Sequence, residues 1–114
     1  MHSDFKDKAI YIKSKEFYTL IARLTDDEVP YALKDQITRS AISIVLNFSE
    51  GYGRFHKNDK KQFYITARAS LNETIACFDL IQVHKTVPSE IQKQFADLAE
   101  EVSKMLSGLI NTLK

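Results

Sequence analysis

Apolar residues recur at steps of three and four along the last quarter of the chain, and this spacing constrains the fold more than any other feature. They are Ile91, Phe95, Leu98, Val102, Met105, Leu109 and Leu113. Steps of this kind put side chains on one face of an α-helix, in a near-heptad seam that suits packing at about 20° against other helices. The spacing predicts a helix that starts at Ser89, with Ser89 as the N-cap and Gln92 completing a capping box.

Three earlier segments show the same helical spacing. They predict helices from Asp4 to Leu24, from Pro30 to Glu50, and from an N-cap at Asn58 or Asp59 to Lys85. Thr25, Asp26, Asp27 and Glu28 are N-cap candidates for the second helix, and Pro30 suits its first turn. A chain of 114 residues with three glycines and two prolines has few turns. The fold class is therefore predicted as all-α, an antiparallel up-down four-helix bundle in a single domain, 1–114.

The second predicted helix is apolar around most of its circumference. One stripe comprises Leu33, Ile37, Ala41, Ile44 and Phe48, and another comprises Ile42, Val45 and Leu46. A helix that is apolar on most sides is expected to be buried on most sides. Three neighbouring helices in a small bundle rarely cover that much surface, so Ile42, Val45 and Leu46 are predicted to contact another subunit.

Polar residues follow the same helix at steps of three and four. They are Gln36, Arg39, Ser40, Ser43, Asn47 and Glu50. The third helix offers Arg68, Ser70 and Glu73 as partners, because antiparallel packing sets the two helices side by side. One interpretation is a hydrogen-bonded network that fixes helix register, formed by Gln36, Ser43, Asn47, Glu50, Ser70 and Glu73. The other is a groove that faces a ligand.

Gly51 and Gly53 are predicted to end the second helix, since glycine is the usual residue of a left-handed C-terminal cap. The string Gly51-Tyr52-Gly53-Arg54 resembles a phosphate-binding loop only superficially. Such a loop follows a strand and opens a helix, whereas this one follows a helix. Termination of the helix therefore explains the glycines better.

Positive charge is concentrated just after these glycines. The net charge of the chain is +1, yet residues 51–70 hold five Lys or Arg and one Asp. The predicted nucleic-acid-binding residues are Arg54, Lys57, Lys60, Lys61 and Arg68, with Arg39 able to join them. Aromatic residues are interleaved with them, and such rings can stack on unpaired bases. The alternative is a solvated loop whose aromatic side chains point into the core.

No catalytic or metal-binding constellation is apparent. A di-iron bundle needs Glu-x-x-His motifs, and none of the three histidines has a Glu three residues before it. Cys77, the single cysteine, fits a small buried hydrophobe better than a nucleophile. We therefore expect no enzyme activity, no cofactor and no metal. A lone cysteine, no segment like a signal peptide and no apolar run of membrane-spanning length predict a cytoplasmic protein without a membrane partner.

An ordered string of residues resembles a known family. The matching positions are Leu33, Gln36, Arg39, Ala41, Ser43, Ile44, Asn47, Glu50, Gly51, Gly53, Arg54, Phe63, Ala67, Ser70 and Glu73. They resemble the signature of the bacterial four-helix bundle proteins encoded in intervening sequences of 23S rRNA genes, the S23-like family. The accessory variability protein of diversity-generating retroelements is a relative. Val45 and Ala69 stand where the family usually has proline and glycine.

The resemblance implies an up-down bundle and a homopentameric ring. For the retroelement relatives it also implies nucleic-acid binding and partnership with a reverse transcriptase. The leading hypothesis is a non-enzymatic oligomeric bundle that binds RNA or DNA through the loop between the second and third helices. The competing hypothesis is a protein-interaction scaffold without a nucleic-acid role.

Overall fold

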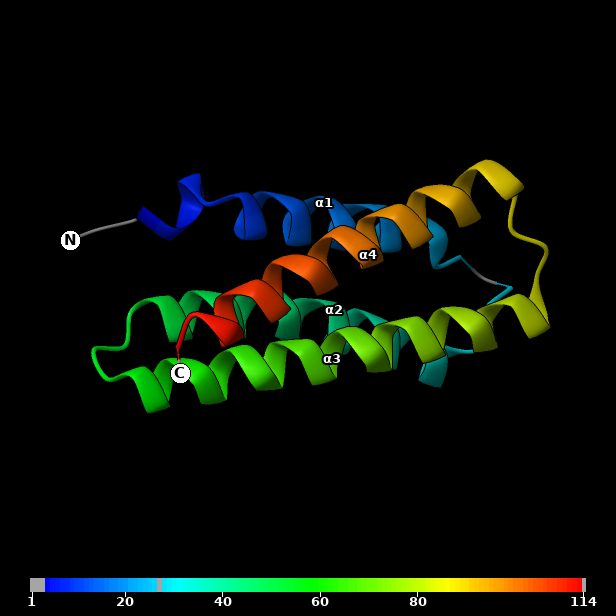
Figure 1. Ribbon diagram of the computed structural model, residues 1–114. Helices are drawn as coiled ribbons and strands as arrows, with labels where there is room; N and C mark the ends of the chain where they lie inside the picture. The colour runs from blue at the N-terminus through cyan, green and yellow to red at the C-terminus, as the bar shows by residue number, and fades with distance from the viewer. Residues whose placement is uncertain (1–3, 27, 114) are drawn as a thin grey trace.

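The computed structural model describes residues 4–26 and 28–113, which form one short 3-10 helix and four α-helices. These are η1 (Asp4–Asp7), α1 (Ala9–Leu24), α2 (Tyr31–Tyr52), α3 (Lys57–His84) and α4 (Ser89–Asn111). The four helices run back and forth along one axis, giving a rod of 44 × 26 × 25 Å (Figure 1). The predicted all-α four-helix bundle is confirmed.

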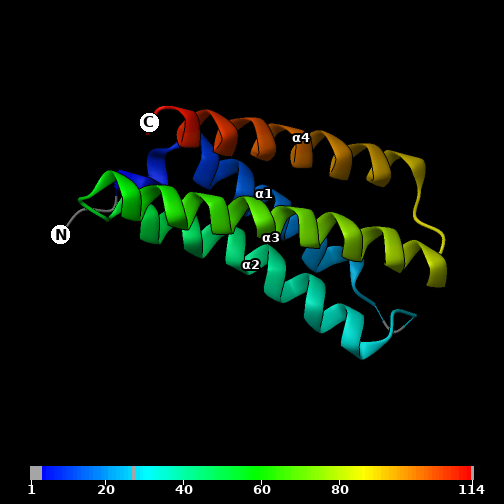
Figure 2. The ribbon, with the colours of Figure 1, turned by 60° about the horizontal axis from the view of Figure 1, so that its bottom comes forward.

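Each helix packs against two neighbours. α1 and α3 both lie between α2 and α4, and the contact between α2 and α3 is the most extensive. Figure 2 shows α2 and α3 side by side, with α4 on the other side of α3. The α2–α3 connection lies at the same end of the rod as both ends of the described chain, which we call the loop end. The other two connections lie at the opposite end, the far end.

Aromatic stacking in the core joins helices that are distant in sequence. The rings of Phe78 on α3 and Phe95 on α4 are stacked, with centroids 3.8 Å apart, and Phe17 on α1 lies 4.8 Å from Phe95. Nearer the loop end, Phe48 of α2 stacks on Tyr64 of α3 at 5.8 Å. These rings belong to the apolar faces that the spacing predicts, so burial of those faces holds the four helices together.

α2 ends within the predicted glycine segment, with Gly53 as its C-cap, but the predicted left-handed conformation of this cap is wrong. α2 continues through Gly51 to Tyr52, and no glycine among the described residues has a positive φ. Gly51 is instead buried where α3 approaches most closely. A Cβ atom there would lie 2.7 Å from Tyr64 Cε1 and 2.9 Å from Phe63 Cβ. The residue is small because two helices meet at it.

The predicted side-chain N-caps are also wrong. α3 begins at Lys57 after His56, and α4 begins after Pro88, so neither Asn58, Asp59 nor Ser89 caps a helix. α2 likewise begins after Pro30, without a side-chain cap. α3 and α4 therefore begin earlier than their predicted caps imply, whereas α2 begins later than its N-cap candidates Thr25, Asp26 and Glu28 imply. Gln92 donates from Nε2 to the Val87 carbonyl at 2.9 Å rather than to a capping box.

The first helix departs from the prediction in a smaller way. The first predicted helix is interrupted, because η1 ends at Asp7 and α1 starts only at Ala9. α3 ends at His84, and Lys85 is its C-cap. The Lys85 ammonium pairs with the Asp26 carboxylate, which joins the two connections of the far end and lowers the pKa of Asp26. Asp27, another predicted N-cap candidate, lies outside the described residues.

Candidate nucleic-acid interface

Three of the predicted basic residues lie on one side of α3. Lys57, Lys61 and Arg68 are four and seven residues apart, and a turn of roughly 100° per residue puts them within about 40° of one another around the helix axis. Among the described residues, none of the three forms an ion pair with a carboxylate. We call Lys57, Lys61 and Arg68 the α3 basic stripe. Its charges are available to a polyanion.

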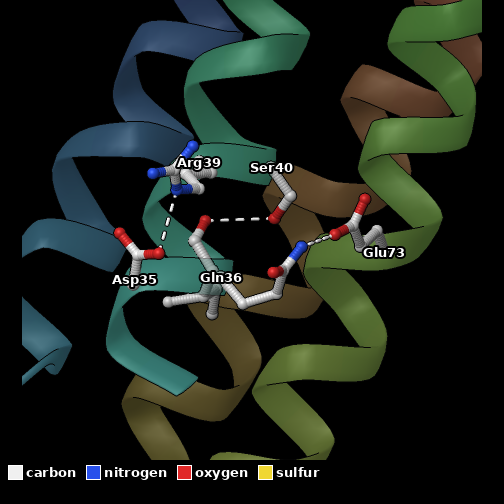
Figure 3. A network of polar contacts seen from close by, with 6 residues as sticks. Asp35, Gln36, Arg39, Ser40 and Glu73 are labelled. Atoms are coloured by element: carbon white, nitrogen blue, oxygen red, sulfur yellow. Dashed lines mark hydrogen bonds and ion pairs between the residues drawn. The ribbon is translucent and has the colours of Figure 1, made fainter. Parts of the chain in front are cut away.

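The other three predicted basic residues have partners within the chain. Arg39 pairs with Asp35 at 2.9 Å (Figure 3). Arg39 lies about four helical turns before Gly53, the C-cap of α2. Arg54 pairs with Glu50 at 3.0 Å, and its guanidinium lies 4.7 Å from the centroid of the Phe63 ring.

Lys60 is the third of these residues, and it completes the end of α2. Its Nζ donates to the carbonyl oxygens of Tyr52 and Gly51 at 2.7 and 3.2 Å. It also lies 5.3 Å from the centroid of the Tyr52 ring. A lysine near a helix C-terminus stabilises the helix, because it donates hydrogen bonds to the unpaired carbonyl groups and interacts favourably with the negative end of the helix dipole. The structure therefore gives Lys60 a role inside the fold that its place in a charge cluster does not reveal.

The interleaved aromatic residues differ in how far their side chains are exposed. Tyr64 is buried against Phe48, and burial raises the pKa of its hydroxyl group. Tyr52 and Phe63 are half-buried. Phe55, at the tip of the α2–α3 connection, is 90% exposed. Only one of the four aromatic side chains is therefore largely available to a ligand.

A hydrogen-bonded network joins α2 to α3. The Ser43 and Ser70 hydroxyl groups lie 2.7 Å apart, and Asn47 Nδ2 donates to the Ser43 carbonyl and hydroxyl oxygens at 2.8 and 2.9 Å. Gln36 Nε2 donates to a Glu73 carboxylate oxygen across the helix pair (Figure 3). These five residues of the predicted network are thus brought to the α2–α3 contact.

The network differs from the prediction at three positions. Glu50 is outside it, because its carboxylate pairs with Arg54. Ser40 and Thr74 are inside it, with hydroxyl oxygens 2.8 Å apart and both side chains buried. Thr74 follows Ser70 by one helical turn, and this spacing is the signal that could have identified it. Every buried side-chain nitrogen or oxygen in the described residues has a partner, as expected of a structural network.

The described residues contain no group of three or more His, Cys, Asp or Glu side chains placed to hold a metal ion. Cys77 is buried, and burial raises the pKa of its thiol group, with Glu73 adding to the effect. The thiol is therefore a weak nucleophile at neutral pH. Within the described ranges, no helix combines the length and the apolar character needed to cross a membrane.

A comparison with protein families bears on what this surface serves. The family model described as 23S rRNA-intervening sequence protein matches residues 6–108. The chain belongs to this family. The match spans all four helices, and it confirms the resemblance read from Leu33 to Glu73. No curated protein matches the chain.

The geometry explains part of the family signature that the chain carries. Gln36, Ser43, Ser70 and Glu73 bond to one another across α2 and α3, and Gly51 lets the two helices approach. These signature positions serve packing. The α3 basic stripe includes none of these signature positions.

Proposed function

We propose that the chain is a non-enzymatic, oligomeric helical bundle that binds nucleic acid, RNA in particular, through the loop end of α3. The observation that carries this proposal is the α3 basic stripe, whose three cations share one side of a helix without carboxylate partners in the described chain. Lysine and arginine held in this way neutralise phosphates and release counterions. Family membership is consistent with an association with RNA.

The proposed assembly is a homopentameric ring in the cytoplasm. Family resemblance suggests the ring, and exposed apolar residues on α2 support self-association. Ile42 is 37% exposed and Leu46 is 59% exposed, while Val45 is half-buried. A ring would present five copies of the α3 basic stripe, so that weak phosphate contacts would add through multivalency. Cys77 is the single cysteine, so the chain has no intrachain disulfide, which supports a reducing compartment.

The test compares two variants that remove the same charge. One changes Lys57, Lys61 and Arg68 to Gln, and the other changes Lys13, Lys93 and Lys104, which pair with carboxylates elsewhere. We expect the first to weaken binding to a single-stranded RNA at least tenfold and to lower the slope of log affinity against log salt by about two units. The second should bind like the wild type. Equal affinity for all three proteins would refute the proposal.

A protein-interaction scaffold is the second candidate, and exposed apolar residues near the far end of α3 favour it. Leu80 and Val83 are 53% and 78% exposed, one helical turn apart. The resemblance to retroelement proteins suggests a reverse transcriptase as one such partner. A partner recovered after nuclease treatment, and lost when Leu80 and Val83 are changed to Ser, would support the scaffold. Recovery that ceases with nuclease treatment would support RNA binding.

A further inference from the structure

Phe55 is an exposed aromatic residue in an otherwise basic connection. Its side chain is 90% exposed, the largest exposed fraction among the large apolar side chains described. Its ring meets the edge of the His56 ring at 5.2 Å, and Arg54 and Lys57 lie on either side in sequence. Exposing a phenylalanine to water forgoes the favourable free energy of burying its ring. An exposed ring between Arg54 and Lys57 suits a partner that has both an apolar face and negative charge.

The neighbouring aromatic rings differ from Phe55, whose one aromatic contact is with the His56 ring beside it in sequence. Tyr64 stacks within the core, and the guanidinium of Arg54 covers the Phe63 ring. Lys8 and Lys60 lie 5.7 and 5.3 Å from the Tyr52 ring. Each of these rings has partners from the chain itself. Phe55 lies in the connection that leads into α3, two residues before Lys57, the first residue of the α3 basic stripe.

We infer that Phe55 is a stacking platform for one unpaired base of the RNA, so that the ligand is single-stranded where it meets the loop end. This inference rests on the proposed function and specifies its ligand. In a duplex both faces of a base are already stacked, whereas a loop, bulge or free end offers an open face. Lys57 and Lys61 then meet the phosphates that follow the stacked base, and stacking tolerates any base because each has an aromatic face.

A fluorescence experiment tests the stacking directly, because the chain contains no tryptophan. Phe55→Trp introduces a single indole at the loop end, and Val83→Trp introduces one at a comparably exposed position near the far end. The probes are a hairpin RNA with an unpaired loop and a blunt duplex of the same length. Saturating hairpin should quench the indole of Phe55→Trp and leave that of Val83→Trp unchanged, and the duplex should quench neither.

Affinity supplies the second measurement. Phe55→Ala should weaken hairpin binding at least about fivefold while leaving duplex binding unchanged, and Val83→Ala should change neither. Two results would overturn the stacking role and leave the proposed function intact. One is that Phe55→Trp binds the hairpin without quenching of its indole. The other is that Phe55→Ala loses affinity equally for the hairpin and the duplex. Emission of Phe55→Trp that shifts with protein concentration alone would place Phe55 in a contact between copies and would also overturn the stacking role. Absence of RNA binding to the wild-type protein would overturn both proposals.

Discussion

Gly51 is the residue at which α3 approaches α2 most closely, because it carries no Cβ atom. From the sequence it looks like a helix stop, because a second glycine and a loop follow it. In the structure it is helical and buried, and α3 lies against it. The sequence cannot separate these two roles, since both require the absence of a Cβ atom. Contact with a helix that begins six residues later decides between them.

Gly51→Ala tests the packing role. The added methyl group would lie 2.7 Å from Tyr64 Cε1, so α2 and α3 must move apart or the ring must shift. We expect a loss of about 1–3 kcal/mol in the free energy of unfolding, measured by urea denaturation.

Gly108→Ala is the matched control, because it is also a helical glycine and a Cβ there meets nothing within 4 Å. Alanine favours a helix interior over glycine, so this variant should gain about 0.5–1 kcal/mol. A Gly51→Ala protein as stable as Gly108→Ala would show that the helices can relax around the methyl group.

At the scale of the element, the α2–α3 pair is where sequence reasoning succeeds and then stops. Helical spacing was enough to predict that Ser43, Asn47, Ser70 and Glu73 face a common contact. It could not exclude Glu50, because this carboxylate can equally pair with Arg54, four residues further along the chain at the start of the connection. It also could not show that Lys60 is occupied by backbone carbonyls, since that contact depends on how the connection folds back.

A double-mutant cycle tests the hydrogen bond between Ser43 and Ser70. Each single change to alanine leaves one hydroxyl group at the contact without its partner, which should cost about 1–3 kcal/mol. The double variant should lose less than the sum of the two, by about 0.5 kcal/mol or more, because both partners are then absent.

The control for this cycle is Thr66→Ala, which removes an exposed hydroxyl group bonded only within α3, to the Gln62 carbonyl. It should change the unfolding free energy by less than about 0.5 kcal/mol. Strictly additive losses for Ser43 and Ser70 would mean that the bond contributes no coupling between the helices.

At the scale of the whole molecule, the exposed side of α2 bears on assembly. Ile42 and Leu46 lie between two ion pairs, Asp35–Arg39 and Glu50–Arg54, at successive steps of three and four along the helix. An apolar centre with a charged rim is the usual composition of a protein interface. The sequence predicted that this side is apolar, but one chain does not reveal which surface of a second copy would cover it.

Leu46→Asp should disrupt the proposed ring, because a carboxylate buried between subunits without a partner is strongly unfavourable. Light scattering should then report species near the 13.1 kDa of one chain in place of a larger assembly. Leu80→Asp, at a similarly exposed site on α3, should keep the wild-type mass. A wild-type protein that already has the mass of one chain would contradict the ring.

Both ends of the described chain lie at the same end of the rod as the α2–α3 connection, which has a practical consequence for fusion design. A peptide tag joined to either end by a short flexible linker stays near Phe55 at an effective concentration of the order of millimolar. A histidine-rich or basic tag would therefore become part of the surface whose affinity is being measured. Thr86, exposed in the connection at the far end, is a better anchor for immobilisation or labelling. A solid support coupled at Thr86 would leave the loop end of the protein exposed to the solution.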